Sequence, residues 1–366
     1  MCTSPEGNET SERKTGHLRL SIEEGSRLQF QGLTAGWERV RLVHRALPEL
    51  DLADVDTAVT IFGHRLQAPL LISSMTGGAP EAMLINRRLA RAAQAAGVAL
   101  GLGSMRVALD DPTEAIDFQV REAAPDILLF ANLGAVQLNY GYGVDDCRRA
   151  VELAQADALI LHLNPLQEAI QPGGNTNFAG LLRQIEQVCR ALPVPVVVKE
   201  VGWGISGEVA RQLVDVGVAG IDVAGAGGTD WAAIEARLAG EEPRLRLAQV
   251  FAQWGIPTAE AVPQVRQAAP GAVVIASGGV RNGLDVAKAI ALGADAAGLA
   301  MPFLQAAARS AEAVKAELAQ LIAELKLAMF ATGSANLAAL RQAQCSTFQV
   351  SRSTFDVSHC HTIAGS

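Results

Sequence analysis

Eight short apolar segments follow one another from residue 69 onward, and this regular series constrains the fold more than any other feature. Each segment is rich in Val, Ile and Leu, which is typical of β-strands. The segments between them mostly carry apolar residues at three- and four-residue spacing, which indicates helices. Alternating strands and helices predict parallel βαβ units. The predicted strands are residues 69–75, 98–103, 126–134, 158–164, 195–201, 220–225, 273–279 and 296–302.

Helical periodicity is clearest in residues 81–96, 178–190, 208–216 and 284–292, and glycines at 97, 217 and 293 stand where a helix would stop. The strands show little polar alternation, which indicates burial on both faces of a parallel sheet. Eight such units fit a closed barrel better than an open doubly wound sheet. We therefore predict an α/β fold: a single (β/α)₈ TIM barrel with an N-terminal extension and a C-terminal polar tail.

Composition supports one large domain, because 49% of the 366 residues are hydrophobic, which is ample for one core. Residues 13–341 are predicted to form the barrel and its N-terminal segment. A strand pair with a turn at Gly63-His64 is expected to lead into the barrel. The polar residues 1–12 are predicted to be disordered, and residues 342–366 to be a flexible tail.

Several classes of function are disfavoured by charge and composition. The net charge is −8 and no basic block occurs, so nucleic acid is not an expected partner. No apolar run approaches the length of a membrane span, and the polar N-terminus does not resemble a signal peptide. The five scattered cysteines are typical of reduced thiols, so a cytoplasmic location is expected.

The richest group of polar residues closes the fourth predicted strand, in His162-Leu-Asn-Pro-Leu-Gln-Glu168. Side chains alternate along a strand, so His162 and Asn164 should face the same way, with Gln167 and Glu168 in the loop beyond. A lone histidine on an apolar strand is usually a hydrogen-bonded core residue. Here, however, nearly every predicted strand ends in polar residues or glycines, and barrels place their chemistry at these ends.

Two further strand ends predict an anionic cofactor. Lys199 ends an otherwise buried strand, and a buried ammonium needs an anionic partner, which Glu200 on the opposite side cannot supply. The glycine-rich residues 277–283 follow strand seven, and the loops after strands seven and eight form the usual phosphate site of barrels. Together with Asn132 after strand three, this arrangement suggests flavin mononucleotide (FMN) lying across the barrel mouth.

The chain resembles the type 2, FMN-dependent isopentenyl diphosphate isomerases from Arg13 to about Arg341. Two departures stand out: Gly16 replaces an acidic residue, and Met105 replaces a glutamine common in the family. The resemblance rests on Arg13-Lys-Thr-Gly-His17, Ala46-Leu-Pro-Glu-Leu-Asp51, Ser73-Ser-Met-Thr-Gly-Gly78, Gly103-Ser-Met-Arg106, the His162–Glu168 stretch, the Gly225–Thr229 loop with Trp231, and Ala328-Met-Phe-Ala-Thr-Gly-Ser334.

The resemblance also implies roles for individual residues. Glu168 would bind Mg²⁺, and Lys199, His162 and Gln167 would act in catalysis, with His162 as a substrate contact rather than a proton donor. FMN would contact Ser74, Met75, Thr76, Ser104, Asn132, Lys199, Thr229, Gly278, Gly279, Arg281, Ala300 and Met301. Substrate would contact Arg13, Lys14, His17, Ser104, Met105, Arg106, His162, Asn164 and Gln167.

The implied reaction interconverts isopentenyl and dimethylallyl diphosphate, with NADPH reducing the flavin once. We expect a homo-oligomer, a tetramer or octamer. An FMN-dependent 2-hydroxy acid oxidase is an alternative, but it needs a histidine base, and Glu-Val-Gly-Trp-Gly follows Lys199. A non-catalytic flavin- or prenyl-diphosphate-binding barrel is a third possibility, which retention of Glu168, Lys199 and Arg13 argues against.

Overall fold

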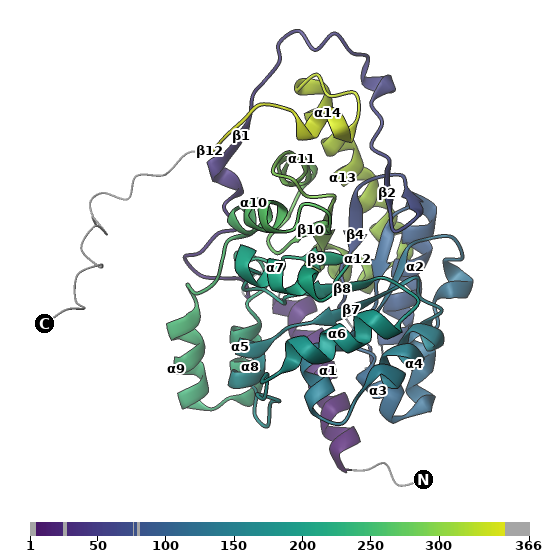
Figure 1. Cartoon of the computed structure of the whole chain (residues 1–366), viewed down its shortest axis with the longest axis vertical. Helices are drawn as coiled ribbons and strands as arrows, with labels where there is room; N and C mark the ends of the chain where they lie inside the picture. Colours follow the sequence, from purple (N-terminus) through teal and green to yellow (C-terminus); the bar gives the residue numbers. More distant parts are fainter. Residues whose placement is uncertain (1–4, 25–27, 76, 79–80, 348–366) are drawn as a thin grey trace, which may run out of the picture.

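The computed structural model describes residues 5–24, 28–75, 77–78 and 81–347, with the backbone alone for residues 5–14 and 347. At its centre is a closed barrel of eight parallel strands in sequence order, whose last strand pairs with the first (Figure 1). The predicted (β/α)₈ barrel is confirmed, and each predicted strand contains an observed one. The barrel strands are β4 (Leu70–Ile72), β5 (Ala99–Gly101), β6 (Leu129–Gly134), β7 (Ala158–His162), β8 (Val196–Lys199), β9 (Gly220–Asp222), β10 (Val273–Ser277) and β11 (Ala296–Leu299).

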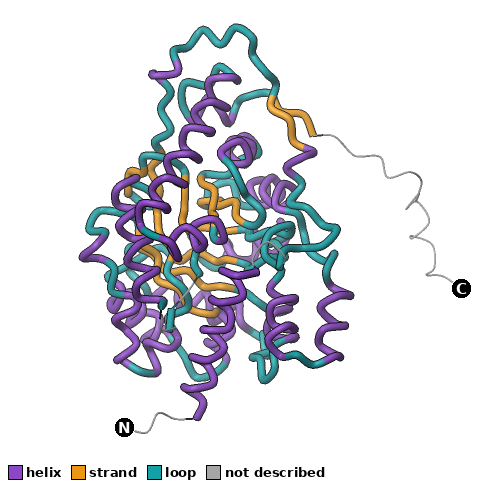
Figure 2. The backbone as a smooth tube through the Cα atoms, turned by 180° about the vertical axis from the view of Figure 1, so that it is seen from behind, coloured by secondary structure: helices purple, strands orange, loops and turns teal. Residues whose placement is uncertain are grey.

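Helices surround the barrel (Figure 2). The four predicted helices correspond to α2 (Ala82–Ala96), α6 (Leu181–Ala191), α7 (Gly207–Asp215) and α11 (Gly283–Ala291). Gly97 ends α2 in the left-handed conformation at φ 63°, as predicted. No helix of the described residues is both long and apolar enough to cross a membrane. The other elements are helices α3 (Arg106–Asp110), α4 (Val144–Ala154), α5 (Pro165–Ile170), α8 (Trp231–Ala239), α9 (Glu242–Phe251), α10 (Thr258–Ala268), α12 (Met301–Arg309), α13 (Ala311–Ala331) and α14 (Leu337–Arg341), and 3₁₀ turns Trp37–Arg39, Leu52–Asp54, Pro112–Phe118, Arg121–Ala123 and Ala135–Asn139.

The barrel interior has two layers of side chains. The lower layer, nearer the N-terminal ends of the strands, is apolar, and the upper layer, at their C-terminal ends, is polar. Phe130, Ile160 and Val197 belong to the buried lower cluster. Because side chains alternate along a strand, the residue two positions further on each strand faces the same interior. That position is polar or glycine in every strand, so the sequence itself places the chemistry at the C-terminal end. The polar upper layer consists of Ser73, Gly101, Asn132, His162, Lys199, Asp222, Ser277 and Gly298.

An antiparallel hairpin closes the other end of the barrel. It consists of β2 (Val59–Ile61) and β3 (His64–Leu66), joined through Gly63 at φ 82°. The buried side chains of Ile61 and Leu66 belong to the lower apolar cluster, and Phe62 packs against it. The hairpin predicted before strand one is therefore confirmed, and it seals the apolar layer from below.

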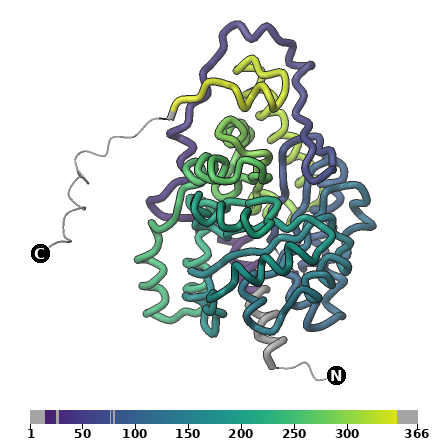
Figure 3. The backbone as a smooth tube through the Cα atoms, in the orientation of Figure 1, coloured from purple at the N-terminus to yellow at the C-terminus, as the bar shows by residue number. Residues whose placement is uncertain are grey.

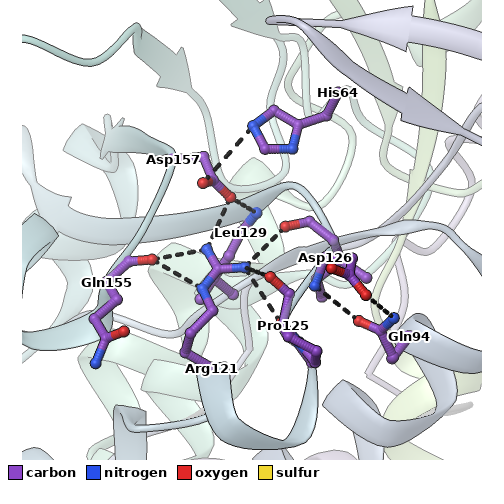
Figure 4. Close-up of polar contacts among 10 residues, drawn as sticks. His64, Gln94, Arg121, Pro125, Asp126, Leu129, Gln155 and Asp157 are labelled. Atoms are coloured by element: carbon purple, nitrogen blue, oxygen red, sulfur yellow. Dashed lines mark hydrogen bonds and ion pairs between the residues drawn. The ribbon is translucent and has the colours of Figure 1, made fainter.

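Two similar arginine–aspartate clusters fix the starts of strands in opposite halves of the barrel. Asp157 Oδ2 accepts hydrogen bonds from Leu129 N and Arg121 Nη2, each at 2.8 Å (Figure 4). Asp295 Oδ2 accepts from Val274 N at 2.9 Å and from Arg266 Nη2 at 2.5 Å. Both arginines also donate to loop carbonyls that precede the strand. These charge-assisted hydrogen bonds fix the N-terminal ends of the strands, at the end of the barrel opposite the cavity.

Both chain ends depart from the predicted disorder. Helix α1 spans Pro5–Glu24, so residues 5–12 are helical rather than disordered, and residues 1–4 lie outside the described residues. Its C-terminal half packs on α8 and α12, which gives a polar sequence a reason to be helical. Cys345–Thr347 form β12, antiparallel to β1 (Val40–Leu42), so this part of the predicted tail is a strand, and the two segments, far apart in the sequence, run side by side in Figure 3. Residues 348–366 lie outside the described residues.

Candidate active site

A cavity of about 420 Å³ opens at the C-terminal ends of the barrel strands. All eight strand ends or the loops directly after them contribute to its wall, and α1 completes it. Its volume is within the range of small-molecule sites, and its position is where barrels place their chemistry. The predicted site residues that line it are His17, Ser74, Met75, Ser104, Arg106, Asn132, His162, Asn164, Gln167, Glu168, Lys199, Thr229, Gly278, Gly279, Arg281, Ala300 and Met301.

The loop after β10 packs its backbone closely against the backbone of the loop after β9. Gly278 and Gly279 have φ of 94° and 68°, a region that favours glycine. A Cβ at Gly278 would lie 2.1 Å from the carbonyl oxygen of Gly225. Nearby, α12 begins at Met301, and Arg281 Nη2 donates to Gly227 O at 3.3 Å. Backbone N–H groups, a helix N-terminus and a guanidinium fit the predicted phosphate group.

The polar upper layer supplies the other part of the cavity. Lys199 is 9% exposed, and its Nζ donates to the Glu200 carbonyl oxygen at 2.6 Å. His162 Nδ1 lies 2.8 Å from Asn132 Oδ1, so Nδ1 carries the proton, because an amide oxygen only accepts. The buried Oγ of Ser74 has no hydrogen-bond partner among the described residues. An orphaned hydroxyl and a buried ammonium in the wall of one cavity are expected where a polar, anionic ligand completes the bonding, so these residues fit a flavin.

Glu200 organises the loop after β8 rather than the cavity. Its Oε2 accepts from the backbone N–H groups of Val201, Gly202, Trp203 and Gly204. Burial raises the pKa of Glu200 to about 7, against the lowering produced by the N–H groups of Val201, Gly202 and Trp203 and by Lys199. The carboxylate thus folds the loop that brings Val201 and Gly202 into the cavity wall.

Glu168 lies in the first turns of α5 with its carboxylate held in place. Asn164 Nδ2 donates to Glu168 Oε1 at 2.9 Å, and Asn175 N donates to Oε2 at 2.6 Å. Among the described residues, no three His, Cys, Asp or Glu side chains gather as a metal site. A Mg²⁺ ion here would therefore rely on one carboxylate, with water and substrate phosphate as the other ligands.

Helix α1 crosses the mouth of its own barrel. His17 packs edge-on against Trp231, with ring centroids 5.4 Å apart, and its Nε2 lies 3.0 Å from Glu235 Oε1. Gln167 Nε2 donates to the same carboxylate oxygen at 2.7 Å. A Cβ at Gly16 would lie 2.8 Å from Leu238 Cδ2, so the glycine that departs from the family pattern permits close packing of α1 on α8.

Met105, a predicted substrate contact, is not among the residues that line the cavity. This side chain is fully buried in the main core, and it does not line the cavity, because Met105 turns inward where α3 begins. Thr76 and the side chains of Arg13 and Lys14 lie outside the described residues, although both basic residues fall within α1. Sequence reasoning missed other polar residues at the cavity, since none lies at a strand end with a recognisable motif. They are Ser21, Gln29, Gln137, Gln171 and Gln305 in the wall, and Glu235 behind His17 and Gln167.

Comparison with known proteins places the fold in a flavin-dependent class. A family described as FMN-dependent dehydrogenase matches residues 20–121 and 166–347. A solved mandelate oxidase variant with an FMN adduct is 23% identical, with a TM-score of 0.65 over 94% of this chain and all of that one. Another mandelate oxidase structure is 22% identical, with a TM-score of 0.62 over 93% of this chain and 98% of that one. At this identity the solved structures show the fold alone.

Curated relatives are much more similar. The isopentenyl-diphosphate delta-isomerase of Nostoc sp. is 55% identical over 93% of this chain and 96% of the relative. That of Stutzerimonas stutzeri is 54% identical over 91% and 96%. That of Synechocystis sp. is 51% identical over 91% and 95%. The chain belongs to the isopentenyl-diphosphate delta-isomerases of the type 2, FMN-dependent class.

Proposed function

We propose that this protein interconverts isopentenyl and dimethylallyl diphosphate with FMN, Mg²⁺ and NADPH, and that NADPH only reduces the flavin. The observation that carries the proposal is the composition of one cavity. Lys199 and the Gly278–Gly279 cradle lie in the same cavity as His17, Arg106, Gln167 and Glu168. The first set suits a flavin phosphate and an electron-rich ring, and the second suits a diphosphate with its metal.

Moving a double bond requires a proton to be added to an unactivated alkene and another to be removed nearby. Reduced FMN supplies this proton chemistry when bound, and the protein supplies orientation and charge. The Lys199 ammonium stabilises negative charge at the flavin ring. Asn132 fixes the tautomer of His162. Asn164 orients Glu168, and the Gln167–Glu235–His17 contacts hold the substrate side of the wall under α1.

The alternative of a 2-hydroxy acid oxidase has the fold in its favour but not the residues. Such an enzyme needs a histidine base beside a carboxylate-binding arginine. In this chain the loop after Lys199 is folded around the Glu200 carboxylate and carries no histidine. A non-catalytic binder of flavin or prenyl diphosphate is the remaining alternative, and only turnover separates it from an enzyme.

The decisive experiment incubates the protein anaerobically with FMN, Mg²⁺, NADPH and isopentenyl diphosphate. We expect dimethylallyl diphosphate in large molar excess over the NADPH consumed, because an isomerisation consumes no electrons. Dithionite-reduced enzyme should need no nucleotide, and deuterium from heavy water should enter the product. NADPH consumption equal to product would instead indicate an oxidoreductase, and flavin binding without product would indicate a binder.

Glu168→Gln is expected to weaken apparent Mg²⁺ affinity by about 10- to 100-fold, because it removes the charge and keeps the shape of the ligand. FMN affinity should stay near the wild-type value, since the flavin-binding residues are unchanged. Mg²⁺ titration of activity and FMN titration of the apoprotein measure the two effects. Glu186→Gln, on the outer helix α6, is the matched control. Loss of flavin with an unchanged Mg²⁺ requirement would show that the two sites had been misplaced.

We extend the proposal to a homo-oligomer, a tetramer or octamer, in the cytoplasm. Large apolar side chains are exposed at Leu47 and Val250, each 70%, and at Trp254, 63%, and exposed apolar surface is common at protein interfaces. Cys147, Cys189 and Cys345 are free, which suits a reducing compartment. Sedimentation of the purified protein tests the oligomer.

A further inference from the structure

Asp222, the acidic member of the polar upper layer, has no role in the function proposed above. It ends β9 and is 0% exposed. Its Oδ1 accepts from Ser277 Oγ at 2.5 Å and from Ala224 N at 3.3 Å. Its Oδ2 is buried with no hydrogen-bond partner among the described residues. A buried carboxylate oxygen without a donor is costly unless a nearby positive charge compensates it.

Lys199 is the residue that can compensate it. Lys199 and Asp222 are register partners on the neighbouring strands β8 and β9, so their side chains leave the barrel wall at the same level and on the same side. Burial raises the pKa of Asp222, and the Lys199 ammonium is the largest influence that lowers it. The other nearby carboxylate, that of Glu200, is already bonded to the backbone N–H groups of its own loop.

Asp222 is also tied to the loop that fits the flavin phosphate. Ser277, which donates to Asp222, immediately precedes Gly278 and lines the cavity. This bond and the one from Ala224 both go to Oδ1 and fix the orientation of the carboxyl group. The carboxyl group is therefore held next to Ser277, a residue of the cavity wall.

We propose that Asp222 is a positioning residue that balances the charge of Lys199 and thereby lowers the reduction potential of the bound flavin. The proposal rests on the FMN binding proposed above. Reduced flavin bound in this cavity would bring negative charge near Lys199, and the Asp222 carboxylate on the neighbouring strand would weaken the attraction between them. The reduced cofactor is consequently less stabilised than Lys199 alone would make it, which keeps it a stronger base for the proton transfers of the isomerisation.

The first test measures the midpoint potential of FMN in the reconstituted holoenzyme by slow enzymatic reduction against a reference dye. Asp222→Asn keeps shape and removes the charge, so the potential should move to a more positive value. Asp230→Asn is the matched control, because Asp230 is a buried carboxylate that caps α8 and asparagine caps equally well. Its shift should be smaller. An unchanged or more negative potential in Asp222→Asn, or an equal shift in both variants, overturns the proposal.

The second test needs no flavin and separates this inference from the proposed function. Thermal unfolding of the apoprotein is compared for wild type, Asp222→Asn, Lys199→Met and the double variant. If the two charges balance each other, Asp222→Asn should cost less stability in the Lys199→Met background than in the wild type. If Asp222→Asn alone does not fold but the double variant does, this result also supports a charge balance between the two residues. Additive losses, or failure of both to fold, overturn the charge balance, whereas absence of FMN binding in the wild type refutes only the proposed cofactor.

Discussion

Lys199→Met is expected to lower kcat by about 10²- to 10³-fold, the usual cost of removing a preorganised charge that stabilises an anion in an active site. Lys199 is 9% exposed at the end of β8, and no other lysine lines the cavity among the described residues. The variant should lose affinity for reduced FMN more than for oxidised FMN, because only the reduced form carries negative charge near the ammonium. Steady-state kinetics and anaerobic flavin titrations measure the two effects.

Lys315→Met is the control for this prediction. Lys315 lies on α13, its Nζ is 3.8 Å from Glu312 Oε1, and both side chains are exposed. It should retain wild-type activity and flavin affinity. Equal losses for both forms of the flavin in Lys199→Met would assign Lys199 to packing rather than to charge stabilisation.

The barrel could be predicted from the sequence because its strands are short, continuous apolar runs, whereas its helices carry apolar residues at three- and four-residue spacing. The run Ala158–Leu161 is apolar throughout because both faces are buried, and the next residue, His162, begins the polar upper layer. The same switch from apolar to polar recurs at Asn132 and at Lys199, after Ala131 and Val198. Most candidate site residues could be located for the same reason: the end of a barrel strand marks the cavity.

The parts that could not be predicted depend on tertiary contacts. Residues 5–12 look like a disordered terminus in composition, yet they continue a helix whose later residues pack on α8 through Gly16. Met105 stands between two cavity residues, Ser104 and Arg106, but the turn into α3 directs it into the core. Glu235 lies on a helix face, and only folding brings it to His17 and Gln167.

Gly278→Ala is expected to abolish FMN loading and to destabilise the protein by about 3 kcal/mol, the sum of typical costs for a strained backbone and an overpacked site. The left-handed φ of 94° disfavours any side chain, and the added Cβ would lie 2.1 Å from Gly225 O and 2.7 Å from Gly225 N. These neighbours are backbone atoms, so no side chain can rotate away. The loop must shift, and its N–H groups then leave the positions that would bind phosphate.

Gly271→Ala is the matched control, because a Cβ there meets nothing within 4 Å. It should leave both FMN affinity and thermal stability near wild type. Thermal unfolding of the apoprotein and FMN titration separate the two consequences of Gly278→Ala. A variant that unfolds at a lower temperature yet binds FMN as tightly as wild type would show that the loop after β10 does not hold the phosphate. Because the strain lies in the same backbone atoms that would bind the phosphate, the proposed site predicts that stability and flavin affinity fall together.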